Sequence, residues 1–469
     1  QAGVRYAEPD YLFETNALPD DGQFHELWGL HNTGQTGGTT DADIDAPEAW
    51  DFTTGSSEVV VGVMDSGVDL DHVDLEDNIW TNPDEIAGDG IDNDNNGYVD
   101  DLNGWDFYEE TNDPSDQQGH GTHVAGTIGA VGDNGIGVAG VNWEVQVAAL
   151  AIGIEDTPYI STDAAIDAFG YAADIGMDVV NCSWGGSGGM SEAVREAIED
   201  AGEAGVLVVC AAGNAGTNND QNPFYPASYE LDNIVSVAAT TDTDGLASFS
   251  NYGENSVDLG APGAAIYSTQ MDGGYVEMSG TSMASPHVAG AAGLLRAYNP
   301  SSTMEDLRQA LLDSAEPLGT LDGDVATGGR LNVHDAIQEL WTPVEGVDLA
   351  LTNMEVSPSS LSGVTEVDIS YTIRNFGDTD VDDDFDLQFS LSADNRPDDT
   401  DDILVTQTLS EGLDATGILT GSVHVDDFPP EDPNLTGTFL VGFVDASDLF
   451  DEGEHETNNI AAGRLSWAD

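Results

Sequence analysis

The sequence contains no lysine: all eight of its basic residues are arginines, against 89 aspartates and glutamates, and the formal net charge at pH 7 is −81. A chain this anionic repels nucleic acids and anionic membrane surfaces, which excludes nucleic acid as a partner. Apolar residues make up 39% of the chain, too many for a disordered acidic protein. The composition therefore indicates a folded protein from a saline setting, of halophilic type.

Long apolar runs are also missing. No run approaches the roughly 20 residues of a membrane-spanning helix, and the longest apolar segment, residues 206–213, is typical of a buried strand. We therefore expect a soluble protein without a membrane span. Because the sequence begins at Gln1 without Met, we expect the start of a precursor to lie outside it.

Cysteine is scarce, with only Cys182 and Cys210, and both lie in apolar segments typical of strands. Two such cysteines make neither a disulfide framework nor a metal-ligand spacing. Two buried free thiols are the simpler interpretation, and a single bridge between neighbouring strands is the alternative.

At 469 residues the chain exceeds the usual size of one hydrophobic core, which predicts two domains. Residues 179–214 follow a strand, helix, strand pattern with continuous apolar strands, which predicts an α/β domain on a doubly wound, mostly parallel sheet. From residue 344 the pattern changes to alternating apolar and polar residues, as in residues 367–373. This period of two predicts an antiparallel β-sandwich over residues 344–469.

Three polar residues stand at the ends of buried segments. Asp65 ends a β-branched run, His120 opens a segment of small residues, and Ser282 opens an almost wholly apolar segment. Proline is tolerated near a helix start and disrupts a helix deeper in, so Pro286 predicts a helix that begins close to Ser282. A serine nucleophile needs a base to take its proton, and an imidazole base needs a carboxylate to hold its tautomer, so each role has one candidate here.

Two of these assignments have alternatives. Asp69, Asp71 and Asp74 also follow the first strand, but sites in open parallel sheets collect at the carboxyl ends of strands, which favours Asp65. His120 and His123 are spaced like a pair of metal ligands, yet the acidic residue of a His-Glu-x-x-His zinc site is absent. A histidine base is therefore the better interpretation.

The segments that carry these residues resemble those of the subtilisin-like serine peptidases, or subtilases, and the order Asp, His, Ser is that of subtilisin. The resemblance covers residues 20 to about 340, so we expect a subtilisin-like peptidase domain over residues 20–343. It implies a secreted, extracellular endopeptidase acting on protein or peptide substrates through an acyl-enzyme, in which Asp65 orients His120 and Ser282 attacks the scissile carbonyl. A binding protein on a degenerate peptidase scaffold and a processing peptidase with few substrates are the rival interpretations.

The resemblance also implies an oxyanion hole, formed by the side-chain amide of Asn214 and the backbone N–H of Ser282. Taken alone, Asn214 would fit a left-handed turn residue after Gly213 equally well. Phe224 falls where the family places the floor of the pocket for the residue before the cut; a ring turned inward would make that pocket shallow, and a ring turned outward would leave it open. The remaining substrate-binding residues that the resemblance implies are a strand-like segment, Ser183, Trp184 and Gly185, and the opposite wall, Ala211, Ala212 and Gly213.

Residues 89–101 begin like a calcium loop, with Gly97 sixth from Asp92. Asn103 stands where an EF-hand has its bidentate glutamate, so the match is partial. A second calcium site, implied by the resemblance, joins Asp74 to Asp133 or Asn134, two neighbours that compete because their loop is one residue longer than usual. The candidate ligands of the first loop are Asp92, Asp94, Asn96 and Asp100.

Both ends of the chain carry further resemblances. Residues 4–10 resemble the tail of an inhibitory propeptide, so residues 1–19 are expected to be a propeptide remnant and connector that the enzyme itself cuts between Asp10 and about residue 20. The C-terminal region resembles adhesion-related sandwich domains of bacterial surface and secreted proteins, which implies a cell-surface or polymer ligand.

Overall fold

The structure is a computed structural model that describes residues 18–340 except 155, 156 and 158. In the C-terminal part it describes residues 349–357, 366–375, 381, 385–392, 402–409, 413, 418–426, 439–444 and 460–464. The chain divides into two units, Gln1–Leu340 and Trp341–Asp469. Residues 1–17, which contain the expected propeptide tail, lie outside the described residues.

The first unit is built on a nine-stranded sheet with the order β10-β11-β7-β6-β5-β4-β1-β3-β2. All neighbouring pairs are parallel except β10 with β11. This arrangement confirms the predicted mostly parallel sheet. Its strands are β1 (Gly55–Asp65), β2 (Gly104–Asp106), β3 (Glu144–Ala151), β4 (Val179–Cys182), β5 (Leu207–Ala211), β6 (Ile234–Thr240), β7 (Leu259–Pro262), β10 (Glu316–Pro317) and β11 (Gly329–Arg330).

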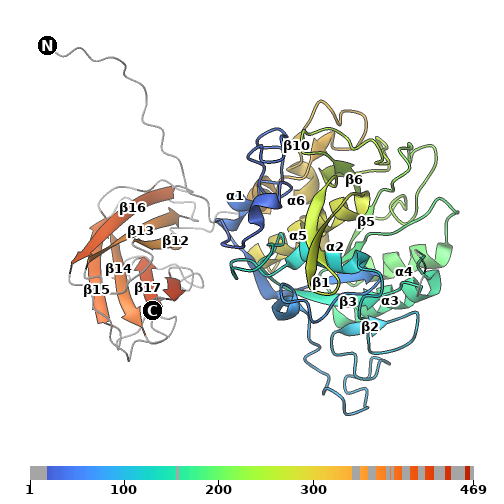
Figure 1. Cartoon of the computed structure of the whole chain (residues 1–469), viewed down its shortest axis with the longest axis horizontal. Helices are drawn as coiled ribbons and strands as arrows, with labels where there is room; N and C mark the ends of the chain where they lie inside the picture. Colours follow the sequence, from blue (N-terminus) through green and yellow to red (C-terminus); the bar gives the residue numbers. More distant parts are fainter. Residues whose placement is uncertain are drawn as a thin grey trace. The chain divides into compact units, whose positions relative to one another are not determined.

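Helices cover both faces of this sheet (Figure 1). In β5, Leu207 and Val209 pack with α2 (His120–Gly129) and α5 (Thr281–Tyr298) on one face. Val208 and Cys210 pack on the other face with α3 (Thr162–Ile175) and α4 (Glu192–Glu203). Burial on both faces explains why these strands read as continuous apolar runs. The other helices are α1 (Ala46–Trp50), α6 (Met304–Asp313) and α7 (Val333–Leu340), with 3-10 turns at Phe24–Glu26 and Glu76–Asn78 and a hairpin of β8 (Ile266–Gln270) and β9 (Gly274–Met278).

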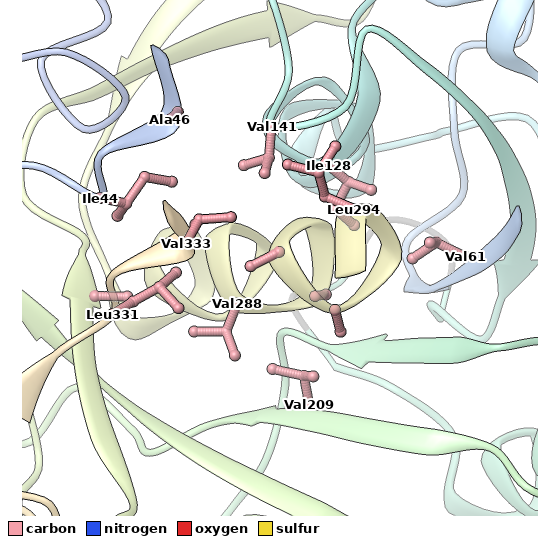
Figure 2. Close-up of a cluster of buried hydrophobic side chains, with 14 of the residues drawn as sticks. Ile44, Ala46, Val61, Ile128, Val141, Val209, Val288, Leu294, Leu331 and Val333 are labelled. Carbon is pink, nitrogen blue, oxygen red and sulfur yellow. The ribbon is translucent and has the colours of Figure 1, made fainter. Parts of the chain in front are cut away.

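Helix α5 begins one residue before Ser282, as Pro286 predicted, and continues through that proline. Every residue from 283 to 295 is buried, so α5 is a core helix of the unit. Figure 2 shows how closely it is surrounded: Val288 and Leu294 of α5 lie among Val61, Val209, Ile128 and Val141. The serine is thus fixed on a rigid, fully packed element.

Cys182 and Cys210 are register partners on the neighbouring strands β4 and β5. Both are free and fully buried, as the simpler interpretation expected. Among the described residues, no helix is both long and apolar enough to cross a membrane.

The second unit contains antiparallel strands in two sheets. In β13, Val367, Ile369, Tyr371 and Ile373 are all buried, which is the period of two that the sequence predicted. One sheet has the order β12-β13-β16 and the other β15-β14-β17-β18. The strands are β12 (Leu349–Ser357), β13 (Glu366–Asn375), β14 (Phe385–Ser392), β15 (Asp402–Leu409), β16 (Ile418–Asp426), β17 (Phe439–Val444) and β18 (Ile460–Arg464).

Candidate active site

The carboxyl edge of the parallel sheet carries an open cleft of about 750 Å³. Asp65 is the last residue of β1, His120 the first of α2 and Ser282 the second of α5, and Asn214 follows β5. All four line the cleft. Segments that are far apart in the sequence therefore meet where the topology of a parallel sheet predicts a site.

Asp65 and His120 are in direct contact. His120 donates its Nδ1 proton to Asp65 Oδ1 over 2.7 Å, which leaves Nε2 as the basic nitrogen of the ring. The Asp65 side chain is only 5% exposed, and its charge raises the pKa of His120, although burial acts in the opposite direction. The backbone N–H of Ser66 also donates to Asp65 Oδ1 (2.7 Å), which fixes the carboxylate.

The Ser282 hydroxyl donates to the backbone carbonyl oxygen of Ser183 over 3.0 Å. Before a proton can pass to His120, this hydroxyl must rotate away from Ser183. Such hydrogen bonds commonly align only in the substrate complex.

The Ser282 carbonyl is held by a side chain from another segment. In a regular helix it would accept the N–H of residue 286, but Pro286 has none. The hydroxyl of Ser183 supplies the missing donor at 2.8 Å. That hydroxyl is itself held by Asn181 Nδ2 and by the Ser285 hydroxyl, each at 2.9 Å, and all three side chains are buried.

Asn214 is oriented by Thr281, the first residue of α5. Its Oδ1 accepts from the N–H (2.8 Å) and the hydroxyl (3.1 Å) of Thr281, so its amide nitrogen remains the donor on the cleft side. The residue with positive φ at this turn is Gly213 (φ 108°), so the alternative of a left-handed Asn214 is wrong. Thr281 directly precedes the serine, yet nothing in the local pattern signals its contact with Asn214.

The predicted substrate-binding residues gather at the same cleft, with one exception. Ala212 is fully buried in a separate apolar cluster with Ala238 and Leu321 and does not line the cleft. The residues that do line it are Ser183, Trp184, Gly185, Ala211, Gly213 and Phe224.

A second carboxylate, missed from the sequence, organises the start of the His120 helix. The Asp116 side chain is buried and accepts five hydrogen bonds. Its negative charge contributes to the raised pKa of His120. In the sequence, the only indication of this role was that a polar residue, Asp116, stands four positions before the start of the helix. The five donors are the Ser66 and Thr122 hydroxyls and the backbone N–H groups of Gln118, Gly119 and Thr122.

Asp74 and Asn134 meet as predicted, with Asn134 Nδ2 donating to Asp74 Oδ1 over 2.9 Å. Asp133 faces the N-terminal segment, where its carboxylate accepts from the Asp20 N–H and its own N–H donates to Asp21. Asp21 was not predicted: it is buried, and its Oδ1 has no hydrogen-bond partner among the described residues. Burial and the charge of Asp74 raise the pKa of Asp21 to about 6. Two buried carboxylates and an orphaned oxygen fit a divalent cation with oxygen ligands.

The loop before β2 brings together a different set of carboxylates from the one predicted. Asp94 lies with Glu85 and Asp101, whose ligand oxygens are all within 4.8 Å of one another. Asn96 joins them, because its Nδ2 donates to Asp94 and Asp101, each over 3.0 Å. The carboxylate of Asp100 instead accepts hydrogen bonds from the backbone N–H groups of Asp89 and Gly90.

The carboxylate of Asp92 accepts hydrogen bonds from the backbone N–H groups of Asn96 and Gly97. The cluster of Glu85, Asp94 and Asp101 also offers the oxygen donors that calcium prefers. No spacing signal pointed to Glu85 or Asp101.

The segments that form the cleft also match known proteins. A model of the subtilase family matches residues 56–338. The chain is 38% identical over 336 residues to a thermophilic serine proteinase of Bacillus sp. (strain AK1), covering 71% of this chain and 73% of the relative. It is 33% identical over 401 residues to an extracellular protease of Xanthomonas campestris pv. campestris, covering 79% and 66%.

A solved structure of a protease from Pseudoalteromonas arctica is similar with a TM-score of 0.55 and 30% identity, over 69% of this chain and 99% of that one. The residues matched by the family model include nearly all of β1, which ends in Asp65, and the helices α2 and α5, which begin at His120 and Thr281. The chain therefore belongs to the subtilase family and is a serine endopeptidase.

Proposed function

We propose that Asp65, His120 and Ser282 form the catalytic triad and that Asn214 completes the oxyanion hole. The observation that carries this proposal is the 2.7 Å contact between Asp65 and His120 in a cleft that Ser282 and Asn214 also line. Each of the four groups has the chemistry that its role requires.

In this mechanism the Ser282 hydroxyl leaves Ser183 and transfers its proton to His120 Nε2 as its oxygen attacks the scissile carbonyl carbon. The oxyanion accepts from the Asn214 amide and from the Ser282 N–H at the start of α5, where unpaired N–H groups favour negative charge. Asp65 stays ionised and stabilises the imidazolium. His120 then protonates the leaving amine, and water releases the acyl group by the same steps in reverse order.

The test combines a fluorophosphonate probe with casein hydrolysis. Wild type should be labelled at Ser282 and should cleave unfolded casein at many sites, whereas Ser282→Ala should fold and do neither. Labelling of Ser282→Ala, or turnover above the oxyanion-hole background, would contradict the triad. Cleavage of a single bond only would favour a dedicated processing peptidase.

We further propose that calcium stabilises the first unit at two positions. Asp21, Asp74 and Asn134 would hold one ion, with Asp133 beside them, and Asp94, Asp101 and Glu85 the other, with Asn96 beside them. The support is charge: no ion pair within the described residues involves Asp21 or Asp74. A bound cation would supply the positive charge that these ion pairs do not bring to Asp21 and Asp74.

We propose salt adaptation from the net charge of −81. The Debye length falls from about 30 Å at 0.01 M to about 3 Å at 1 M, so salt should screen the repulsion and stabilise the fold. Melting followed from 0.1 to 4 M NaCl at fixed calcium tests this. Full stability at 0.1 M would remove the basis for a halophilic protein.

We propose a secreted zymogen with an appended binding domain. The extracellular protease of Xanthomonas campestris supports secretion. The ring centroids of Tyr371 in β13 and Phe389 in β14 are 6.0 Å apart, and this contact supports packing of the two C-terminal sheets into a β-sandwich.

Removing the residues after about 344 should spare hydrolysis of small peptides and impair action on particulate or cell-bound substrates. N-terminal sequencing of Ser282→Ala should find the segment before residue 20 uncut.

A further inference from the structure

We propose that Phe224 closes the pocket for the substrate side chain that precedes the scissile bond and restricts it to small residues such as glycine, alanine and serine. This inference rests on the proposed function, because Ser282 and Asn214 define where the scissile carbonyl lies. It concerns which proteins the enzyme cuts, and where.

The position of the pocket follows from the reacting groups. The carbonyl carbon must lie at Ser282 Oγ, with its oxygen at the Asn214 amide, so the preceding Cα is one bond away. Next to these groups the cleft is bounded by the segments that follow β4 and β5, and each presents a glycine to it, Gly185 and Gly213. A side chain that enters here must pass between the two glycines.

The Phe224 ring already occupies that space. A Cβ atom on Gly185 would lie 2.4 Å from Cε1 and 3.0 Å from Cδ1 of the ring. A Cβ atom on Gly213 would lie 2.4 Å from Nδ2 of the buried Asn251 and 3.1 Å from Cδ2 and Cγ of the ring. One ring therefore lies against both walls, and it can approach the first wall this closely because Gly185 has no side chain.

The backbone around Phe224 is fixed, so the ring is not carried away by a loose loop. Gly186 and Tyr225 exchange two backbone hydrogen bonds, of 2.8 and 2.9 Å, which tie the segment to one wall of the pocket. The Phe224 N–H also donates to the Ser228 hydroxyl over 3.0 Å. A large substrate side chain that enters between Gly185 and Gly213 would therefore have to displace the ring.

The effect should be large, because a single methylene in an apolar pocket changes specificity by about 10- to 200-fold. We therefore expect wild type to prefer alanine over phenylalanine before the cut by at least about 10-fold in kcat/KM. Phe224→Gly should raise the ratio of phenylalanine to alanine by about 100-fold, and Phe224→Ala should raise it less.

The experiment uses the full chain with succinyl-Ala-Ala-Pro-Xaa p-nitroanilides, in which Xaa is Ala, Leu or Phe. Cleavage sites in casein, mapped by mass spectrometry for wild type, provide a measurement that needs no variant. Tyr108→Ala is the matched control: it removes an aromatic ring outside the cleft and should leave the ratio at its wild-type value. Melting temperatures establish that each variant is folded.

Two results would overturn the inference alone: wild type that cuts after phenylalanine as well as after alanine, or a folded Phe224→Gly variant with an unchanged ratio. If wild type cleaves none of these substrates and Ser282 is not labelled, the proposed function fails, and the inference fails with it. The alanine substrate and the probe therefore separate the two failures.

Discussion

The contact between Ser183 and the Ser282 carbonyl leads to a sharp prediction, because Pro286 is what makes it necessary. The proline removes the N–H that would serve this carbonyl in a regular helix, and the Ser183 hydroxyl replaces it at 2.8 Å. Ser183→Ala should therefore leave the carbonyl without a partner. Pro286→Ala should restore an N–H in the right place and make the hydroxyl dispensable for this role.

The magnitude follows from the cost of an unpaired acceptor, about 1–3 kcal/mol when it is shielded from water. Ser183→Ala also removes a partner of Asn181 and of Ser285, but that loss is common to both backgrounds and cancels in a double-mutant cycle. We expect Ser183→Ala to cost about 1–2 kcal/mol less in the Pro286→Ala background than in wild type.

The assay is urea unfolding followed by tryptophan fluorescence, at fixed calcium and salt. All variants carry Ser282→Ala, which keeps the carbonyl and prevents autolysis. In the active background, kcat/KM of Ser183→Ala should fall and partly recover in the double variant, because the carbonyl anchors the nucleophile. Equal costs of Ser183→Ala in the two backgrounds, within about 0.5 kcal/mol, would refute this explanation of the contact.

Three further predictions concern charge and protonation. Asp116→Asn should move the acid limb of kcat/KM to lower pH, because loss of this negative charge lowers the raised pKa of His120; a stationary limb would count against it. Exhaustive chelation at fixed ionic strength should lower the melting temperature, and Asp74→Asn should reduce the gain that calcium restores; unchanged melting would remove the Asp21 and Asp74 site. Burial lowers the pKa of His287 to about 4, below its unfolded value of 6.5. The free energy of unfolding should therefore carry no penalty from His287 above pH 6.5 and should decrease as the pH falls towards 4, because the unfolded state takes up the proton first. We expect this decrease to be about 3 kcal/mol. Urea unfolding at several pH values should show it for the protein with His287 and not for His287→Gln. An identical pH dependence of the unfolding free energy in the two proteins would contradict the prediction.

Much of the fold could be predicted from the sequence because burial leaves a one-dimensional record. The part of a strand that is covered on both faces reads as a continuous apolar run, so the polar residue that ends the run, such as Asp65 at the end of β1, marks the carboxyl edge of the sheet. The start of α5 was predictable for a similar reason, since Pro286 is compatible only with the first turns of a helix. The helix expected within the strand, helix, strand pattern of residues 179–214 is α4, which spans Glu192–Glu203 with Ser191 as its N-cap.

What the sequence could not reveal is pairing across distance. Ser183 is 99 residues from the carbonyl that it holds, and neither residue type is unusual in its own segment. The direction of the Phe224 ring was equally undetermined, because it depends on two glycines that come from different strand ends. Periodicity reports how deeply a residue is buried, and only the topology decides which buried groups meet.

The acidic loop before β2 shows why regular spacing alone was an incomplete guide to its ligands. Alternate positions selected Asp100 together with Asp94, yet the carboxylate of Asp100 is used by the backbone of residues 89–90. The neighbouring Asp101 takes the inner position because Tyr171 of α3 donates to it over 2.6 Å, in the interior of the unit. With 89 acids in the chain, a ligand pattern can arise by chance at many places. The convergence of Glu85, Asp94 and Asp101 is therefore better evidence for a cation site than the spacing of the acids, and it directs the search for ligands to Asp101 rather than Asp100.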